Sequence, residues 1–131
     1  MRMWHCPCGS AKSFEKCCGP YISKQCKPTT PEALMRSRYT AYSQANIGYI
    51  LRTMSGKALK SFNKKEAIEW AKSADWLGLN IMNIKYKNDF IGYVEFIARY
   101  RLNGVEHIIH ERSRFERIVG DWYYVGGRIL H

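Results

Sequence analysis

The sequence predicts an α+β fold in which helices come first and an antiparallel sheet follows. Apolar residues recur at helical spacing as far as about residue 74, and from Trp76 onward they alternate with polar residues, as in strands. Turn residues such as Asn103-Gly104 separate the alternating stretches and favour hairpins between neighbouring strands. Helices followed by such a meander predict a layer of helices on one face of the sheet. A curved sheet that wraps a helix would form a cone with an internal cavity.

Three helices are expected between residue 30 and the sheet. Thr30 is a suitable N-cap and Pro31 suits a first helical turn, so a helix is predicted from there to about Asn46. A shorter helix is expected over residues 47–54. The third is expected over residues 63–74, because Asn-Lys-Lys-Glu at its start is similar to a capping box.

Four strands are expected after the helices. The phase of the alternation slips between Ile81 and Met82, which indicates a β-bulge in the first strand. Gly126-Gly127 is expected to end the last strand. The expected strands cover residues 76–86, 93–102, 105–118 and 122–125.

All five cysteines lie in the first 26 residues, and the first four follow the pattern C-x-C-x8-C-C. An odd total and an adjacent pair argue against disulfides, whereas two close pairs suit a tetrahedral zinc site. Buried or free thiols are the alternative, His5 could replace Cys18 as a ligand, and Cys26 is expected to be an incidental exposed thiol. We therefore predict one Zn²⁺ per chain, with the ligands Cys6, Cys8, Cys17 and Cys18.

The residues between the two cysteine pairs suit this arrangement. Gly9 allows the backbone to bend around the first pair. Ser10 is expected to cap a short helix over residues 11–16 that delivers the second pair, and Gly19-Pro20 is expected to end it.

This segment resembles a known zinc-binding motif. Cys6-Pro7-Cys8-Gly9-Ser10 together with Phe14-Glu15-Lys16-Cys17-Cys18-Gly19 is similar to the SEC-C motif, the zinc-binding tail of the preprotein translocase ATPase SecA. The motif usually has Gly where Ala11 stands, a departure that does not affect a ligand. The resemblance implies a docking module, because in the translocase the motif binds a secretion chaperone and related contexts point to ribosomes.

The rest of the chain resembles the YchJ family. The similarity lies in residues 31–42, Trp76-Leu77-Gly78-Leu79, residues 110–115 and Trp122-Tyr123-Tyr124-Val125. It implies a SEC-C zinc knuckle over residues 1–26 and a cone domain over residues 27–131, similar to nuclear transport factor 2. Many members of this largely uncharacterised family carry a second SEC-C motif, which these 131 residues do not contain.

The formal net charge is +10, and the whole excess lies in the first half of the chain. Residues 1–65 carry 12 basic and 2 acidic side chains, whereas residues 66–131 carry 9 of each. Such a surface favours a polyanionic partner, namely an acidic protein, RNA or the ribosome, while a solvated basic surface is the alternative. The residues expected to contact the partner are Arg36, Arg38, Lys60, Lys64 and Lys65.

Two side chains of the third expected strand are candidates for catalysis. Alternation places Glu111 on the mainly apolar inner face and His110 on the opposite face. A carboxylate among apolar residues suits a general base, although an ion pair of Glu111 with Arg36 or Arg38 is favoured.

The principal hypothesis is therefore a non-enzymatic zinc-binding docking protein, and the alternative is a small-molecule binder or enzyme that uses the cone cavity. No run of about 18 apolar residues occurs, so no membrane helix is expected. No secretory signal is evident, and the chain is expected in the cytoplasm.

Overall fold

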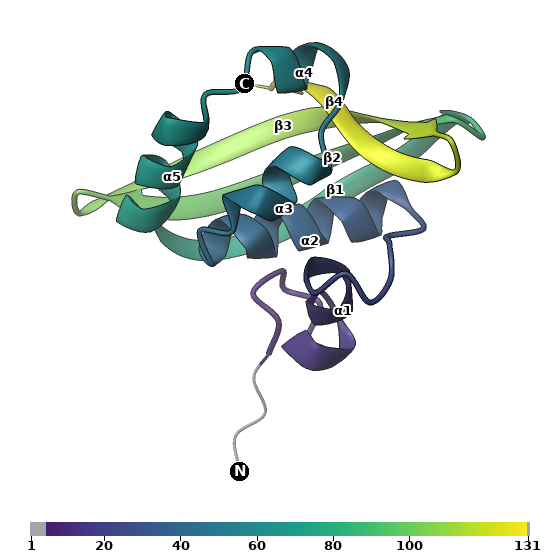
Figure 1. Ribbon diagram of the computed structural model, residues 1–131. Helices are drawn as coiled ribbons and strands as arrows, with labels where there is room; N and C mark the ends of the chain where they lie inside the picture. Colours follow the sequence, from purple (N-terminus) through teal and green to yellow (C-terminus); the bar gives the residue numbers. More distant parts are fainter. Residues whose placement is uncertain (1–4, 131) are drawn as a thin grey trace.

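The computed structural model describes residues 5–130 and shows helices packed on one face of a curved four-stranded sheet (Figure 1). The expected α+β class is confirmed. The expected domain ranges begin at residue 1 and end at residue 131, and both of these residues lie outside the described part. The helical elements are η1 (Phe14–Lys16), α1 (Gly19–Ile22), α2 (Pro31–Ser43), α3 (Ile47–Arg52), α4 (Gly56–Lys60) and α5 (Lys64–Ser73). The strands are β1 (Asp75–Asn88), β2 (Ile91–Leu102), β3 (Val105–Ile118) and β4 (Asp121–Ile129).

The sheet is an antiparallel meander with the strand order β1-β2-β3-β4. The expected hairpin turn is confirmed, because Leu102 pairs with Val105 across Asn103-Gly104. Both turn residues have positive φ, 52° and 78°, as a two-residue type I′ turn requires. Tight turns of this kind keep consecutive strands adjacent and fix their register.

Irregularities in the edge strands give the sheet its curvature. The expected bulge between Ile81 and Asn83 is confirmed, and β1 has two further register shifts. The expectation that Gly126-Gly127 ends the last strand is wrong, because both glycines pair with β3 and β4 continues to Ile129. A register shift at Arg114/Phe115 lets β4 bend around the helices.

Helix α2 is the centre of the core. Its residues Leu34, Met35 and Tyr39 pack against the inner face of the sheet, where Val94 and Phe115 are fully buried. The helix begins where expected, because the Thr30 side chain accepts a hydrogen bond from the Ala33 amide at 3.1 Å. It ends earlier than expected, at Ser43.

The other helices pack beside α2 and β4, since α3 and α5 contact α2 and α4 contacts β4. The Asn46 side chain caps α3, which explains the early end of α2, and Asn63 caps α5 as predicted. Helix α4 was not expected, and it begins at Gly56 with a φ of 66°. The link between α3 and α4 bonds to β4, since the Ser55 amide donates to the Tyr124 carbonyl at 3.0 Å.

No helix among residues 5–130 has the length and apolar character that a membrane crossing needs.

The cap of α2 can be tested by mutation. Thr30→Ala removes the acceptor for the Ala33 amide, so we expect a loss of about 1 kcal/mol in the free energy of unfolding, measured by urea denaturation. Thr30→Ser should retain most of the stability, and Thr29→Ala at the exposed neighbouring position should have no effect. Equal stability of Thr30→Ala and the wild type would contradict this assignment of the cap.

Candidate functional site

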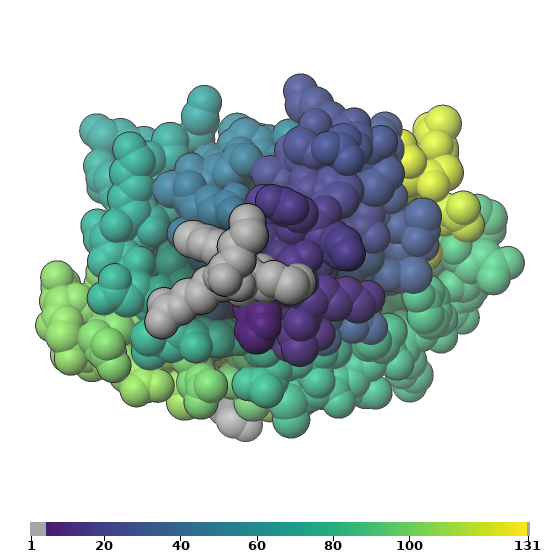
Figure 2. All heavy atoms as spheres, turned by 90° about the horizontal axis from the view of Figure 1, so that it is seen from below, coloured from purple at the N-terminus to yellow at the C-terminus, as the bar shows by residue number. Residues whose placement is uncertain are grey.

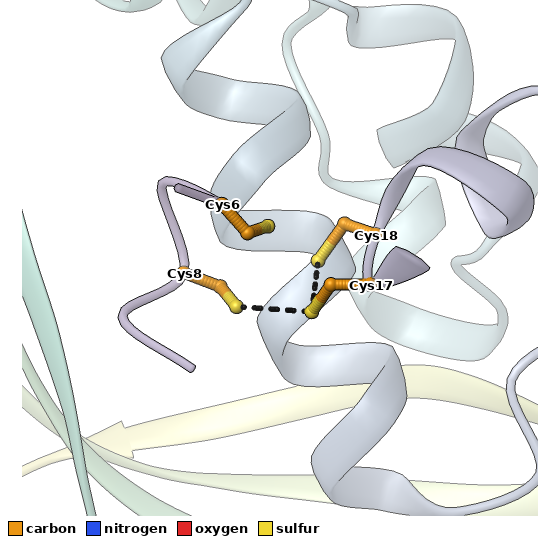
Figure 3. Close-up of side chains that lie close together, drawn as sticks. All are labelled: Cys6, Cys8, Cys17 and Cys18. Carbon is orange, nitrogen blue, oxygen red and sulfur yellow. Dashed lines mark hydrogen bonds between the residues drawn. The ribbon is translucent and has the colours of Figure 1, made fainter. Parts of the chain in front are cut away.

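The four cysteines of the N-terminal segment converge on one point (Figure 3). Their sulfur atoms all lie within 4.8 Å of one another. The Cys8 and Cys17 sulfurs are 3.6 Å apart, and those of Cys17 and Cys18 are 3.9 Å apart. Four thiolates bound tetrahedrally at about 2.3 Å from one metal ion would be separated by about 3.8 Å. The donor set therefore fits a tetrahedral metal centre.

A short loop holds the first pair of cysteines. The Cys6 amide donates to the Lys12 carbonyl at 2.8 Å, and the Gly9 amide donates to the Cys6 carbonyl at 3.2 Å. Gly9 has a φ of 80°, and a Cβ there would lie 3.1 Å from the Leu79 carbonyl oxygen of β1. The expected role of this glycine is confirmed by the turn it makes.

The segment that positions the second cysteine pair, Cys17 and Cys18, differs from the expectation. A 3₁₀ turn, η1, replaces the expected helix over residues 11–16, and the Ser10 hydroxyl contacts the Cys17 sulfur at 3.1 Å instead of capping a helix. Gly19-Pro20 begins α1 rather than ending a helix, because proline suits a first turn. Ala11 has a φ of 67°, a left-handed conformation that favours glycine.

The cluster is part of the main core and packs on α2. Cys6, Cys8 and Cys18 are exposed by only 4%, 0% and 1%. The Cys6 sulfur lies 3.6 Å from the Thr40 hydroxyl, and Arg36 Nη1 donates to the Cys8 carbonyl at 2.8 Å. Figure 2 shows this purple segment seated against the rest of the molecule. A metal ion here would tie the start of the chain to α2.

The electrostatics of the cluster favour a thiolate at Cys8. Hydrogen bonds from the Cys18 and Cys6 thiols lower the pKa of the Cys8 thiol, whereas hydrogen bonds to Cys6 and Cys8 raise the pKa of Cys18. One sulfur thus holds negative charge ready for a cation. His5 is exposed and lies outside the four-sulfur cluster, and Cys26 is exposed as expected.

A second candidate site is a cavity of about 850 Å³ between the helices and the inner face of the sheet. Volumes of this size are typical of small-molecule sites. Exposed residues of α4 and α5, such as Lys57 and Glu66, lie at its mouth. Its aromatic lining consists of Tyr39, Tyr42, Phe62, Trp70, Trp76, Phe96 and Tyr124.

Glu111 extends from β3 into this cavity. Its Oε2 accepts a hydrogen bond from Ser113 at 2.5 Å and one from the Tyr124 hydroxyl at 3.4 Å. Burial, and next the Glu111 charge, raises the pKa of Tyr124, which therefore stays protonated as a donor. A Cβ at Gly127 would overlap the Glu111 carboxylate, so glycine at this position makes room for the side chain.

Arg38 is the other charged group inside the cavity. It is only 4% exposed, and its Nη1 donates to the Ile50 carbonyl at 2.9 Å and to Thr53 Oγ1 at 2.8 Å. Its guanidinium lies over the Tyr124 ring, 4.5 Å from the centroid. Burial lowers the pKa of Arg38, but a guanidinium remains charged at neutral pH.

The structure separates the residues that the sequence grouped as partner contacts. Lys60, Lys64 and Lys65 are exposed on α4 and α5. Arg38 is buried in the cavity, so its expected place on the contact surface is wrong. Arg36 is half-buried, and its guanidinium forms an ion pair with Glu32 at 2.9 Å and donates to the Cys8 carbonyl.

The two catalytic candidates lie on opposite faces of β3, as the alternation predicts. His110 lies outside the cavity, where its Nε2 is 2.7 Å from the Glu95 carboxylate. The expected ion pair of Glu111 with an arginine is absent from residues 5–130, because Ser113 and Tyr124 hold the carboxylate instead.

Sequence reasoning gave Tyr124 no role in the cavity, and it gave Arg38 only that of an ion-pair partner of Glu111. Spacing along α2 offered one signal, since Arg38 lies three and four residues from Met35 and Leu34 and so shares their buried face. The contact of Tyr124 with Glu111 could not be predicted without the register of β3 and β4, in which Tyr124 pairs with Phe115 next to a register shift.

Comparisons with known proteins point to one family. The family model described as "YchJ, middle NTF2-like domain" matches residues 30–127. A UPF0225 protein of Geobacter sulfurreducens is 44% identical over 124 residues, covering 93% of this chain and 77% of that protein. The UPF0225 protein YchJ of Shigella dysenteriae is 38% identical, covering 93% and 81%. The solution structure of a SEC-C motif containing protein from Rhodopseudomonas palustris has a TM-score of 0.88 and 37% identity, covering 98% of this chain and 100% of that one.

The positive φ of Ala11 leads to a prediction about stability. Ala11→Gly relieves a left-handed alanine, and we expect the free energy of unfolding to rise by about 1 kcal/mol. Ala33→Gly in α2 should lower it by a similar amount, because glycine is a poor helix former. Thermal and urea unfolding of the three proteins measure both effects. A destabilised Ala11→Gly protein would contradict the left-handed conformation of Ala11.

Proposed function

The chain belongs to the YchJ family, and we propose that this member is a small-molecule-binding cone protein braced by one structural zinc ion in its N-terminal SEC-C knuckle. The observation that carries the proposal is the 850 Å³ cavity with aromatic walls and two internal charged groups, Arg38 and Glu111. Charged groups are seldom left inside a protein without a role, because their burial is costly. A cavity that retains them suits recognition of a polar ligand.

The proposed zinc ion acts on the structure rather than on a substrate. Four cysteine ligands leave no open position on a tetrahedral metal, which is typical of structural sites. Three of the four sulfurs belong to buried residues that pack against α2. We therefore assign to the ion the attachment of the knuckle to the cone. Thiols kept reduced for this purpose suit the cytoplasm.

Binding to the cavity can be tested with the neutral aromatic probe 2-naphthol. We expect it to shift the amide NMR signals of Ala98, Ile109 and Ser113, which line the cavity. Ala58→Trp places a large side chain into the cavity from α4 and should abolish the shifts. Leu59→Trp, at the exposed neighbouring position, is the matched control and should not. If neither 2-naphthol nor its acidic analogues 2-naphthoate and 6-hydroxy-2-naphthoate perturb these signals in the wild-type protein, the proposed function is overturned.

The metal centre leads to a second test. Elemental analysis of the purified chain should give one zinc ion per chain, and Cys8→Ser should lose the zinc and unfold at lower temperature. Cys26→Ser, which alters an exposed cysteine outside the cluster, should bind zinc as the wild type does. A Cys8→Ser protein with unchanged zinc content and stability would refute the assignment.

Docking to a polyanionic partner is the second candidate function. It is supported by the exposed lysines Lys57, Lys60, Lys64 and Lys65 on α4 and α5, which form no ion pair with residues 5–130. Such a cluster suits an acidic protein, RNA or the ribosome.

Co-sedimentation with ribosomes tests this docking surface. Association is expected at low salt and should weaken as salt rises, because contacts with phosphates release counterions. Lys60→Glu with Lys64→Glu should weaken it, while Lys85→Glu with Lys87→Glu on β1 is the control of equal charge. Sedimentation that is absent at low salt, or equal for both double variants, would remove the support for this surface.

A further inference from the structure

We propose that the cavity binds a planar organic anion, whose acidic group bonds to Arg38 and whose N–H or O–H donor bonds to Glu111. The proposal rests on the proposed function and adds the chemical class of the ligand. Three observations carry it: unused donors on Arg38, an unused acceptor on Glu111, and aromatic walls between the helices and the sheet.

The first observation is that Arg38 has hydrogen-bond donors left over. Its Nη1 is occupied, whereas Nε and Nη2 make no hydrogen bond to any residue from 5 to 130. Within the described chain no fully buried side-chain nitrogen or oxygen lacks a partner, so these two nitrogens keep some exposed surface, and the cavity is the open space that Arg38 lines. Two N–H groups in the plane of a guanidinium suit a carboxylate, which accepts both.

The charge of Arg38 also supports the binding of an anion. No carboxylate of the described residues forms an ion pair with it, although it is only 4% exposed. The Tyr124 ring and the two acceptors on α3 and its C-terminal end stabilise the guanidinium without neutralising it. An anion that enters the cavity would supply the missing charge.

The second observation concerns Glu111, which offers an acceptor. Its Oε2 is occupied by Ser113 and Tyr124, whereas Oε1 accepts nothing from the described residues and, by the same reasoning, is open to the cavity. Tyr124 separates the two charged groups, with Arg38 over its ring and Glu111 at its hydroxyl. A ligand that meets both groups therefore needs an acidic end and a donor end.

The third observation is the shape of the walls. Trp70 lies edge-on to Tyr42 and Trp76, with ring centroids 5.4 Å and 4.9 Å apart, and all three line the cavity. Aromatic walls with this arrangement offer both ring faces and ring edges to a flat molecule. The ligand body is thus assigned as a planar ring system.

A set of matched naphthalenes tests the ligand class in the wild-type protein by NMR titration. The probes are 2-naphthol, which has only the donor, 2-naphthoate, which has only the acid, and 6-hydroxy-2-naphthoate, which has both. We expect 2-naphthoate to bind about tenfold more tightly than 2-naphthol, because its bond to Arg38 is charge-assisted. The probe with both groups should bind more tightly again. Equal affinities of 2-naphthol and 2-naphthoate would overturn the ligand class while leaving the proposed function intact, whereas absence of binding by all three would overturn both.

Variants of Arg38 and Glu111 test which residue binds which end of the ligand. Arg38→Lys keeps the charge but loses the planar pair of donors, so it should weaken 2-naphthoate about tenfold and leave 2-naphthol unchanged. Arg52→Lys, on α3 and outside the cavity lining, is the control. Glu111→Gln should weaken 6-hydroxy-2-naphthoate relative to 2-naphthoate. If Arg38→Lys does not fold, the comparison of probes in the wild type still decides the class, and a 2-naphthoate affinity unaffected in a folded Arg38→Lys protein would overturn the role of Arg38.

Discussion

The structure depends on the burial of α2 from two sides. One side packs on the inner face of the sheet through Leu34 and Met35, and another contacts the cysteine cluster through Thr40 and Arg36. A helix held in this way has little freedom to move, because protein interiors are close-packed. Arg38 projects from this fixed element, so the position of its guanidinium in the cavity is set by contacts made elsewhere along α2.

Local patterns along the chain predicted the elements well where caps and turns are strong. Thr30 and Asn63 cap the helices that they were expected to cap, and Asn103-Gly104 makes its hairpin. The errors lie where tertiary contacts overrule local preference. Gly126-Gly127 continues β4 because β3 offers it hydrogen-bonding partners, and α4 forms over a short segment with little amphipathic pattern.

The two parts of the candidate site differ in how far the sequence reveals them. Cysteine spacing sufficed to name the four clustered sulfurs, because chelation by close pairs leaves a local pattern. The cavity leaves no such pattern, since its polar groups come from α2, α4, α5, β3 and β4. The alternation along β3 did place Glu111 inside, yet the partners of its carboxylate depend on the register of β4.

The contact between Glu111 and Gly127 limits which residues can stand at position 127. Any side chain at position 127 would occupy the space of the Glu111 carboxylate, so Gly127 cannot be replaced while Glu111 keeps this rotamer. A larger residue at position 127 would require the Glu111 carboxylate to turn away, and it would then lose its bonds to Ser113 and Tyr124. The glycine therefore keeps the acidic group of the cavity in its present place.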